Sequence, residues 1–168
     1  MKNNPYVGPR PFERGDRPNF YGRSREAREL LSLLLAERVV LFYAPSGAGK
    51  TSLINTMIIP GLEEEGFNPL PVTRVGNALP PEIRPDEVEN IFVFSALMGL
   101  AGADVLPRAL LGQTFPSFLS RYHVDAGDWE SRPPILIVDQ FEEIFTRHRE
   151  RARDIRGFFE QLVEALNE

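Results

Sequence analysis

Hydrophobic positions along the chain follow two spacings, and these spacings predict alternating helices and strands. Apolar side chains recur at intervals of three and four in residues 24–37, which predicts an amphipathic helix capped by Ser24. The strongest helical pattern lies near the C-terminal end, at Ile155, Phe158, Phe159, Leu162, Val163 and Leu166. Short runs of β-prone residues at 39–43, 70–75 and 135–138 instead predict buried strands.

Further elements fill the spaces between these. Residues 88–100 are apolar at nearly every position, and their length favours a buried helix over a strand. Other helices are predicted from Lys50 to just before Pro60-Gly61, at 106–122 with an interruption at Pro116, and at 140–149. Residues 77–86 and 125–134 are predicted loops. Strands that alternate with helices indicate an α/β fold with a parallel sheet.

The first twenty residues differ from the rest, because they are rich in Pro, Gly and Arg. This composition predicts an extended arm. The arm carries Tyr6, Phe12, Phe20 and Tyr21, so we expect it to pack on another part of the chain. We therefore divide the sequence into an entry arm, residues 1–23, and a core, residues 24–168.

Composition excludes several classes of protein. The chain has 168 residues, a length that suits one domain or a fragment of one. Its formal charge of −5 argues against general binding of nucleic acid. It contains no cysteine, so disulfides and thiolate chemistry are excluded, and its two histidines lack metal-site spacing. No apolar run can cross a membrane and no signal peptide is recognisable, so a cytoplasmic protein is the default expectation.

Residues 44–51 carry the strongest chemical signal. They match the phosphate-loop (Walker A) pattern of Ala or Gly, four residues of any type, then Gly-Lys and Ser or Thr, between a predicted strand and a predicted helix. Glycines let backbone N–H groups turn toward a phosphate, and the helix dipole favours an anion there. The residues expected to bind the nucleotide are Ser46, Gly47, Ala48, Gly49, Lys50, Thr51 and Ser52. Lys50 is also expected to act on the β- and γ-phosphates during catalysis.

The run at 135–139 has the Walker B form, four apolar residues followed by Asp139. Strand ends of this kind meet ligands at the carboxyl edge of a parallel sheet. Asp139, through water, and the Thr51 hydroxyl are expected to hold Mg²⁺ together.

A hydrolase also needs a group that activates water, and three residues after Asp139 are candidates. Gln140 can orient water but is a poor base. Glu142 and Glu143 lie one helical turn beyond Asp139, and the spacing slightly favours Glu143. The alternative is that both are ordinary solvated acids at a helix start.

Three parts of the sequence together resemble the novel STAND-class NTPases of bacteria. These parts are residues 5–12 with 20–23, residues 44–53 with 59–62, and the run ILIVDQFEEIFT at 135–146. The resemblance implies a three-layer α/β/α P-loop core of the additional-strand, AAA+-like type, with ATP and Mg²⁺ as cofactors. It also implies that Gly22 and Arg23 lie at the adenine and ribose side. Members of this class are signalling or defence switches that oligomerise under nucleotide control, so we expect self-association.

The sequence departs from this family plan after residue 168. The strand expected next would lie between 39–43 and 135–138, so we expect a truncated core that is marginally stable, aggregation-prone and a weak ATPase. A non-catalytic nucleotide-binding or scaffold module is the alternative function. A P-loop kinase or GTPase is less favoured, because no guanine-recognition motif is present.

Overall fold

The computed structural model describes residues 8, 10–125, 132–146 and 150–167, and for 121–125 it describes the backbone alone. The chain divides into two compact units, Met1–Pro69 and Leu70–Glu168, and each is described by itself. Parts of the loop predicted at 125–134 and of the helix predicted at 140–149 lie outside the described residues, as does Tyr6. In the part of the chain that the structure describes, no helix has the length and apolar character needed to cross a membrane.

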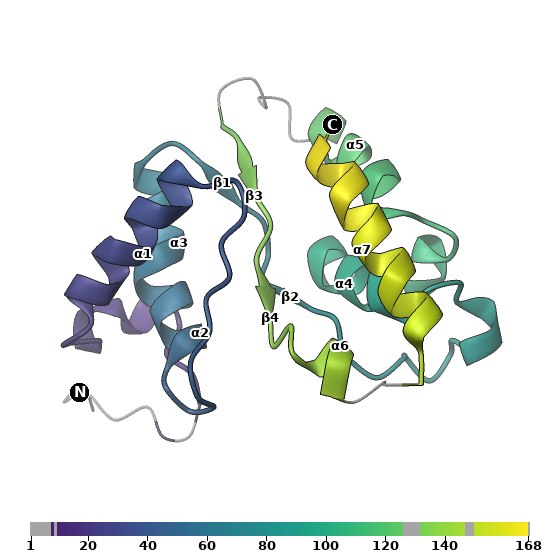
Figure 1. Cartoon of the computed structure of the whole chain (residues 1–168), viewed down its shortest axis with the longest axis horizontal. Helices are drawn as coiled ribbons and strands as arrows, with labels where there is room; N and C mark the ends of the chain where they lie inside the picture. The colour runs from purple at the N-terminus through teal and green to yellow at the C-terminus, as the bar shows by residue number, and fades with distance from the viewer. Residues whose placement is uncertain (1–7, 9, 126–131, 147–149, 168) are drawn as a thin grey trace. The chain divides into compact units, whose positions relative to one another are not determined.

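The first unit consists mainly of helices (Figure 1). Its elements are η1 (Arg14–Asn19), α1 (Ser24–Ala36), α2 (Lys50–Leu53), the π-helical turn η2 (Ile54–Ile58), α3 (Ile59–Glu64) and β1 (Asn68–Pro69). The predicted helix at 24–37 is confirmed, and Ala27 and Leu30 form its buried face. Ser24 is the first helical residue, but the cap position belongs to Arg23 and no side chain caps the helix.

The helix after the phosphate loop continues through Pro60 and Gly61 to Glu64, so the predicted end before Pro60 is wrong. In the π-helical turn the Ile59 N–H donates to the carbonyl of Ile54, five residues back. This wide turn directly precedes Pro60, which has no N–H to contribute, so the ring is accommodated without ending the helix. Gly61 then allows α1 to approach closely, because a Cβ at this position would lie 2.6 Å from a methyl carbon of Leu31.

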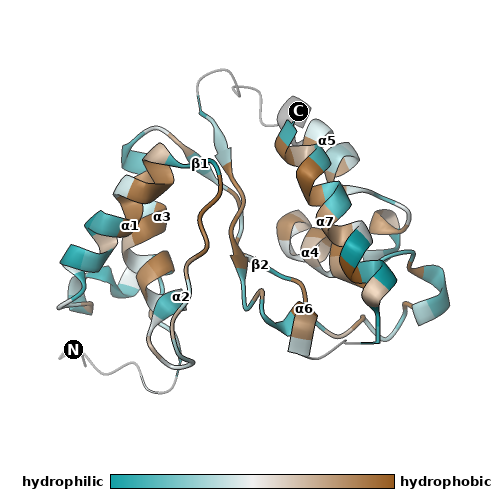
Figure 2. Cartoon of the chain, viewed as in Figure 1, coloured by the Kyte–Doolittle hydropathy of each residue, from teal (hydrophilic) through white to brown (hydrophobic). Residues whose placement is uncertain are grey.

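Residues 39–43 do not form the predicted buried strand. The backbone is extended, and among the described residues no strand pairs with it. Val40 and Phe42 are half-buried, whereas Val39, Leu41 and Tyr43 are 69%, 74% and 84% exposed. Figure 2 shows continuous hydrophobic colour along this segment, between α1 and α2. The β-prone composition was identified correctly, but only one face of the segment finds a packing partner in the structure.

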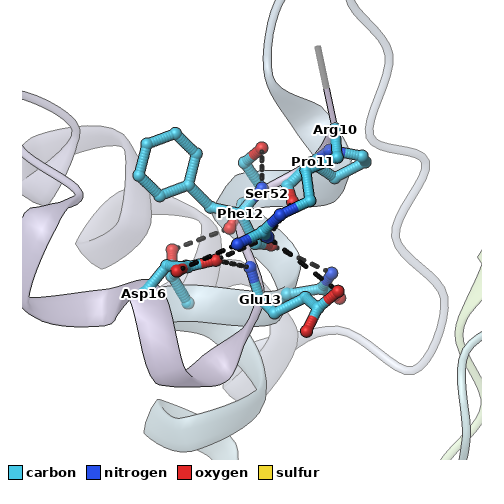
Figure 3. A network of polar contacts seen from close by, with 8 residues as sticks. Arg10, Pro11, Phe12, Glu13, Asp16 and Ser52 are labelled. Atoms are coloured by element: carbon cyan, nitrogen blue, oxygen red, sulfur yellow. Dashed lines mark hydrogen bonds and ion pairs between the residues drawn. The ribbon is translucent and has the colours of Figure 1, made fainter. Parts of the chain in front are cut away.

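The arm packs against the helix that follows the phosphate loop, as predicted, although it contains the 3-10 helix η1 and is not fully extended (Figure 3). The Phe12 N–H donates to Ser52 Oγ at 3.0 Å, and the Phe12 carbonyl accepts from Asn55 Nδ2 at 3.2 Å. Arg10 Nη1 donates to Asp16 Oδ2 at 2.7 Å. This hydrogen bond, with a second from the Glu13 N–H, holds the pKa of Asp16 below its ordinary value.

The second unit contains a short parallel strand pair with helices packed around it. Its elements are β2 (Thr73–Arg74), η3 (Pro85–Glu87), α4 (Ile91–Ala101), η4 (Pro107–Leu110), α5 (Phe115–Asp125), β3 (Pro134–Ile135), β4 (Val138–Asp139), α6 (Glu143–Thr146) and α7 (Ala152–Asn167). β2 pairs with β4 in parallel, with Thr73 opposite Val138 and Arg74 opposite Asp139. The α/β class with a parallel sheet is therefore present, with strands much shorter than the predicted runs.

The predicted strand at 70–75 is interrupted by a bulge. The Leu70 N–H donates to the carbonyl of Ile135 and the next donor, the Thr73 N–H, reaches the carbonyl of Ile137. The donors are three residues apart and their acceptors only two residues apart, so one extra residue lies between the two hydrogen bonds and the regular ladder is broken. Pro71 falls within the longer step, where its missing N–H costs no ladder bond.

Helix α4 confirms the predicted buried helix and forms the centre of the second unit. Asn90 caps it by accepting hydrogen bonds from the N–H groups of Phe92 and Val93. The helix packs on β2, because the Thr73 hydroxyl donates to the carbonyl of Ala96 at 2.7 Å. The apolar stripe predicted on α7 is confirmed in part, since Phe158 is fully buried with its ring 5.5 Å from that of Phe115, whereas Val163 is 55% exposed.

Pro116 does not interrupt a long helix over 106–122. It lies in the first turn of α5, where a missing N–H is tolerated. The break comes earlier, between η4 and α5, where Gly112 has a φ of 70°.

We expect Gly99→Ala to destabilise the protein, because α4 meets β2 at this residue. A Cβ at Gly99 would lie 2.8 Å from the Thr73 Cβ and 3.1 Å from its Cα, so the strand backbone itself would have to move. Overpacking of this kind costs about 1–3 kcal/mol, measured as the free energy of unfolding in urea. Gly15→Ala is the matched control, since a Cβ there meets nothing within 4 Å. Equal stabilities of the two variants would contradict the packing of α4 on β2.

Candidate functional site

The phosphate loop at 44–51 is built by two glycines in the left-handed region of backbone space. Gly47 has a φ of 78° and Gly49 a φ of 76°, conformations that side chains with a Cβ disfavour. The Ala48 N–H donates to the carbonyl of Pro45 at 3.2 Å, which closes the turn. Gly49 directly precedes α2, so the loop ends at the N-terminal end of a helix. This is the geometry in which backbone N–H groups and the helix dipole favour a bound anion.

The Lys50 side chain folds back along this loop. Its ammonium donates to the carbonyl of Ala44 at 2.7 Å and lies 3.4 Å from the carbonyl of Pro45. A lysine ammonium has three donor hydrogens, so these contacts position the charge beside the loop while leaving it able to meet an anion.

Arg23 contacts the same loop from the start of α1. Its Nη1 donates to the carbonyl of Ala48 at 2.9 Å, and its buried Nε lies 3.0 Å from Glu26 Oε1 as an ion pair without hydrogen-bond alignment. The preceding Gly22 has a φ of 83°, which directs the chain into α1. The structure thus brings Arg23 to the phosphate loop, and it gives no position for the adenine or ribose expected beside Gly22 and Arg23.

The other residues expected at the phosphate site differ in their surroundings. Ser46 and Gly47 are exposed, whereas Ala48 and Thr51 are half-buried. Ser52 is buried, and its hydroxyl accepts the hydrogen bond from the arm at Phe12. The residue next to Thr51 therefore links the phosphate loop to the entry arm.

Asp139 ends β4 in the second unit and is only 5% exposed. Its Oδ1 accepts the N–H of Gln140 at 3.0 Å, and its Oδ2 lies 3.2 Å from Nη2 of Arg74. Gln140 has a φ of 56°, which is rare for a residue with a side chain and is typical of functional sites. The backbone turns sharply at this point, so the carboxylate is held by the residue that follows it.

The two candidate acids differ in burial. Glu142 is exposed, whereas Glu143 is half-buried and begins α6. The Glu143 side chain lies against Gly76, because a Cβ added to Gly76 would be 2.9 Å from the Glu143 Cβ. The Glu143 side chain therefore lies against the residue two positions after the end of β2, the strand that also carries Arg74.

Arg74 and Gly76 were not identified from the sequence, although a signal existed. The strand predicted at 70–75 carries a cation near its end, and cross-strand neighbours of opposite charge attract each other. The register of two interrupted strands could not be read from the sequence, so the pairing of Arg74 with Asp139 could not be inferred.

The donor chemistry fits Mg²⁺. Mg²⁺ takes one or two protein oxygens and keeps several waters, and Asp139 and Thr51 supply a carboxylate and a hydroxyl oxygen. Among the described residues no group of three or more His, Cys, Asp or Glu side chains gathers into a metal cage. Thr51 and Asp139 belong to separate units, each described by itself.

We expect Arg23→Gln to loosen the phosphate loop, because it removes the guanidinium that donates to Ala48. Amide hydrogen exchange at residues 47–50 should accelerate at least about tenfold, since a charge-assisted hydrogen bond contributes about 1.5–3 kcal/mol. Arg25→Gln is the matched control, because Arg25 pairs with Glu29 at 2.8 Å on the exposed side of the same helix. Unchanged exchange in Arg23→Gln would show that the loop holds its shape without Arg23.

Comparison with known proteins agrees with this geometry. The family model described as Novel STAND NTPase 1 matches residues 5–168. Searches of curated proteins and of solved structures gave no match. The matched range includes both the loop at 44–51 and the strand end at Asp139. The chain belongs to the Novel STAND NTPase 1 family and is a novel STAND-class NTPase module.

Proposed function

We propose that this chain is the ATP-binding and ATP-hydrolysing part of a signalling or defence switch, and that Mg-ATP controls its oligomerisation. The observation that carries the proposal is the loop at 44–51. Two left-handed glycines, a lysine folded along the loop and a following helix together make a site for the phosphates of a nucleotide. Membership of an NTPase family supports a nucleoside triphosphate as the ligand.

Within this proposal each residue has a separate task. Backbone N–H groups of Gly47 and Gly49 bind phosphate oxygens, Ala48 closes the turn that presents them, and Lys50 neutralises charge on the β- and γ-phosphates. Thr51 and Asp139 hold Mg²⁺, which supplies charge neutralisation when bound. Gly22 and Arg23 line the adenine and ribose side, and the Arg23 contact with Ala48 links that side to the loop.

Water activation is assigned to Glu143. It is half-buried and held against Gly76, whereas Glu142 is exposed, and a base with a fixed position is the more effective one. The Glu143 carboxylate takes the proton from the attacking water, and Lys50 stabilises charge on the transferring phosphoryl group. Gln140 can orient the same water but cannot accept its proton at neutral pH.

The remaining expectations from the family are part of the proposal. They are a three-layer core of the additional-strand, AAA+-like type, self-association through the NTPase module, and action in the cytoplasm. The parallel register of β2 and β4 supports such a core.

A non-catalytic nucleotide-binding or scaffold module is a second candidate, because Gln140 follows Asp139 and Arg74 is paired with the same carboxylate. Titration with ATP and GTP, with and without Mg²⁺, followed by measurement of phosphate release, separates the two functions. ATP binding with release supports the switch, and ATP binding without release supports the second candidate. Absence of binding contradicts both nucleotide functions.

Lys50→Ala should lose nucleotide binding while keeping its fold. The lost charge-assisted contacts contribute at least about 1.5–3 kcal/mol, so the dissociation constant for ATP should rise at least about tenfold. Calorimetric titration measures the affinity, and circular dichroism checks the fold. Arg25→Ala, a change of an exposed cation in the same unit, should bind as the parent does. ATP affinity that survives Lys50→Ala would refute the phosphate site.

Glu143→Gln should slow ATP hydrolysis and spare ATP binding, because the amide keeps the shape of the side chain but cannot accept a proton. The loss expected for a general base is about 10²–10⁴-fold in the rate of phosphate release. Glu142→Gln is the matched comparison and should hydrolyse ATP at the parent rate. The reverse pattern would assign the base to Glu142, and parent rates in both variants would place water activation elsewhere, with Gln140 the first residue to test.

A further inference from the structure

Arg74 forms an ion pair with the Walker B carboxylate, and neither the sequence motifs nor the proposed mechanism uses it. The parallel register sets Arg74 directly opposite Asp139, and Nη2 lies 3.2 Å from Oδ2. Asp139 is 5% exposed at its side chain, whereas the Arg74 side chain is 42% exposed. One partner of this ion pair is therefore fixed in the interior, and the other partner borders solvent.

The backbone of Arg74 is held firmly, so the pair is a property of the fold. The Arg74 carbonyl accepts a hydrogen bond from the Ser95 hydroxyl at 2.9 Å, and the same hydroxyl accepts the N–H of Asn77 at 3.3 Å. Ser95 belongs to α4, the buried central helix of the second unit. Arg74 is thus anchored at its main chain, while its half-exposed guanidinium has room to move toward water.

A buried carboxylate needs a positive partner, and two cations compete for this one. Burial of an unpaired charge is costly, so Arg74 compensates Asp139. The proposed role of Asp139, however, is to hold Mg²⁺ through water, and a divalent cation repels a neighbouring guanidinium. The Gln140 N–H donates to Oδ1 and Arg74 lies against Oδ2, so a Mg²⁺ ion at this carboxylate would meet the guanidinium.

We propose that Arg74 is a positioning residue that acts as a built-in counter-ion of Asp139 and competes with Mg²⁺ for it. This inference rests on the proposed function, since it assumes that Asp139 serves the Mg²⁺ of a bound nucleotide. Arg74 holds the carboxylate in place before Mg-nucleotide arrives. When Mg²⁺ takes over the carboxylate, the guanidinium turns toward solvent, so Arg74 sets the Mg²⁺ concentration at which the module responds.

The test measures binding of a fluorescent ATP analogue, mant-ATP, to the 168-residue chain as Mg²⁺ is increased. Arg74→Gln should lower the Mg²⁺ concentration at half-maximal binding at least about threefold, because the competing charge is gone. Binding of mant-ATP in EDTA should not change. A merely structural role of Arg74 would weaken binding both with and without Mg²⁺, and that result would overturn the proposal.

Two further variants keep the test decisive. Arg74→Lys retains a charge but loses the planar fork, so it should give a smaller shift in the same direction, and it replaces Arg74→Gln if that variant does not fold. Arg108→Gln is the matched control, because Arg108 pairs with Glu87 at 3.1 Å in the same unit. It should show the Mg²⁺ dependence of the parent. An unchanged or raised Mg²⁺ midpoint in the Arg74 variants would overturn the proposal.

Failure of the proposed function is distinguishable from failure of this inference. If the parent does not bind mant-ATP at any Mg²⁺ concentration, the nucleotide function fails, and the competition is then measured with Mg²⁺ alone. Mg²⁺ should raise the melting temperature of Arg74→Gln more than that of the parent, and Asp139→Asn in the same chain should abolish the difference. Equal Mg²⁺ effects on Arg74→Gln and the parent would overturn the competition.

Discussion

The parallel pairing of β2 with β4 is the constraint on which the second unit depends. It joins only two residues on each strand, yet it fixes three other contacts. Thr73 meets the carbonyl of Ala96 on α4, Arg74 meets Asp139, and the chain beyond Arg74 places Gly76 against Glu143. A shift of one residue in this register would exchange the two faces of β2 and separate all three pairs. The buried helix α4 favours this register, because the Thr73 hydroxyl donates to its Ala96 carbonyl and Gly99 lets the strand approach closely.

In the first unit, several contacts converge on the phosphate loop and the start of the helix that follows it. The loop is held from three sides, by Arg23 at its outer carbonyl, by Lys50 along its own backbone, and by the arm through Ser52. Arg23 and the arm come from earlier segments of the chain, whereas Lys50 is part of the loop itself, and the acceptors are backbone carbonyls and the Ser52 hydroxyl. The loop conformation therefore does not rely on the glycines alone, which permit it but do not select it.

The sequence was most informative where one local signal determines the outcome. The helix at 24–36, the buried helix at 91–101, the stripe on α7 and the glycine loop all follow from spacing, capping or left-handed geometry within a few residues. Prediction failed where the result depends on distant partners. Residues 39–43 are β-prone, but burial needs a second packing face, and Pro60 appeared to end a helix that a π-helical turn carries past it. The Arg74–Asp139 pair was missed for the same reason, since it requires the register of two strands that are 65 residues apart.

The positions of the charged groups separate those held by the fold from those available to a ligand. Asp139 is buried and cannot leave its strand, and its partner Arg74 is half-exposed on an anchored backbone. Lys50 differs from Asp139, because its charge is at the end of a long side chain and its hydrogen-bond partner is a neutral carbonyl. Under the proposed function, a Mg-nucleotide would therefore draw Lys50 away from neutral carbonyls and would compete with an ion pair at Asp139.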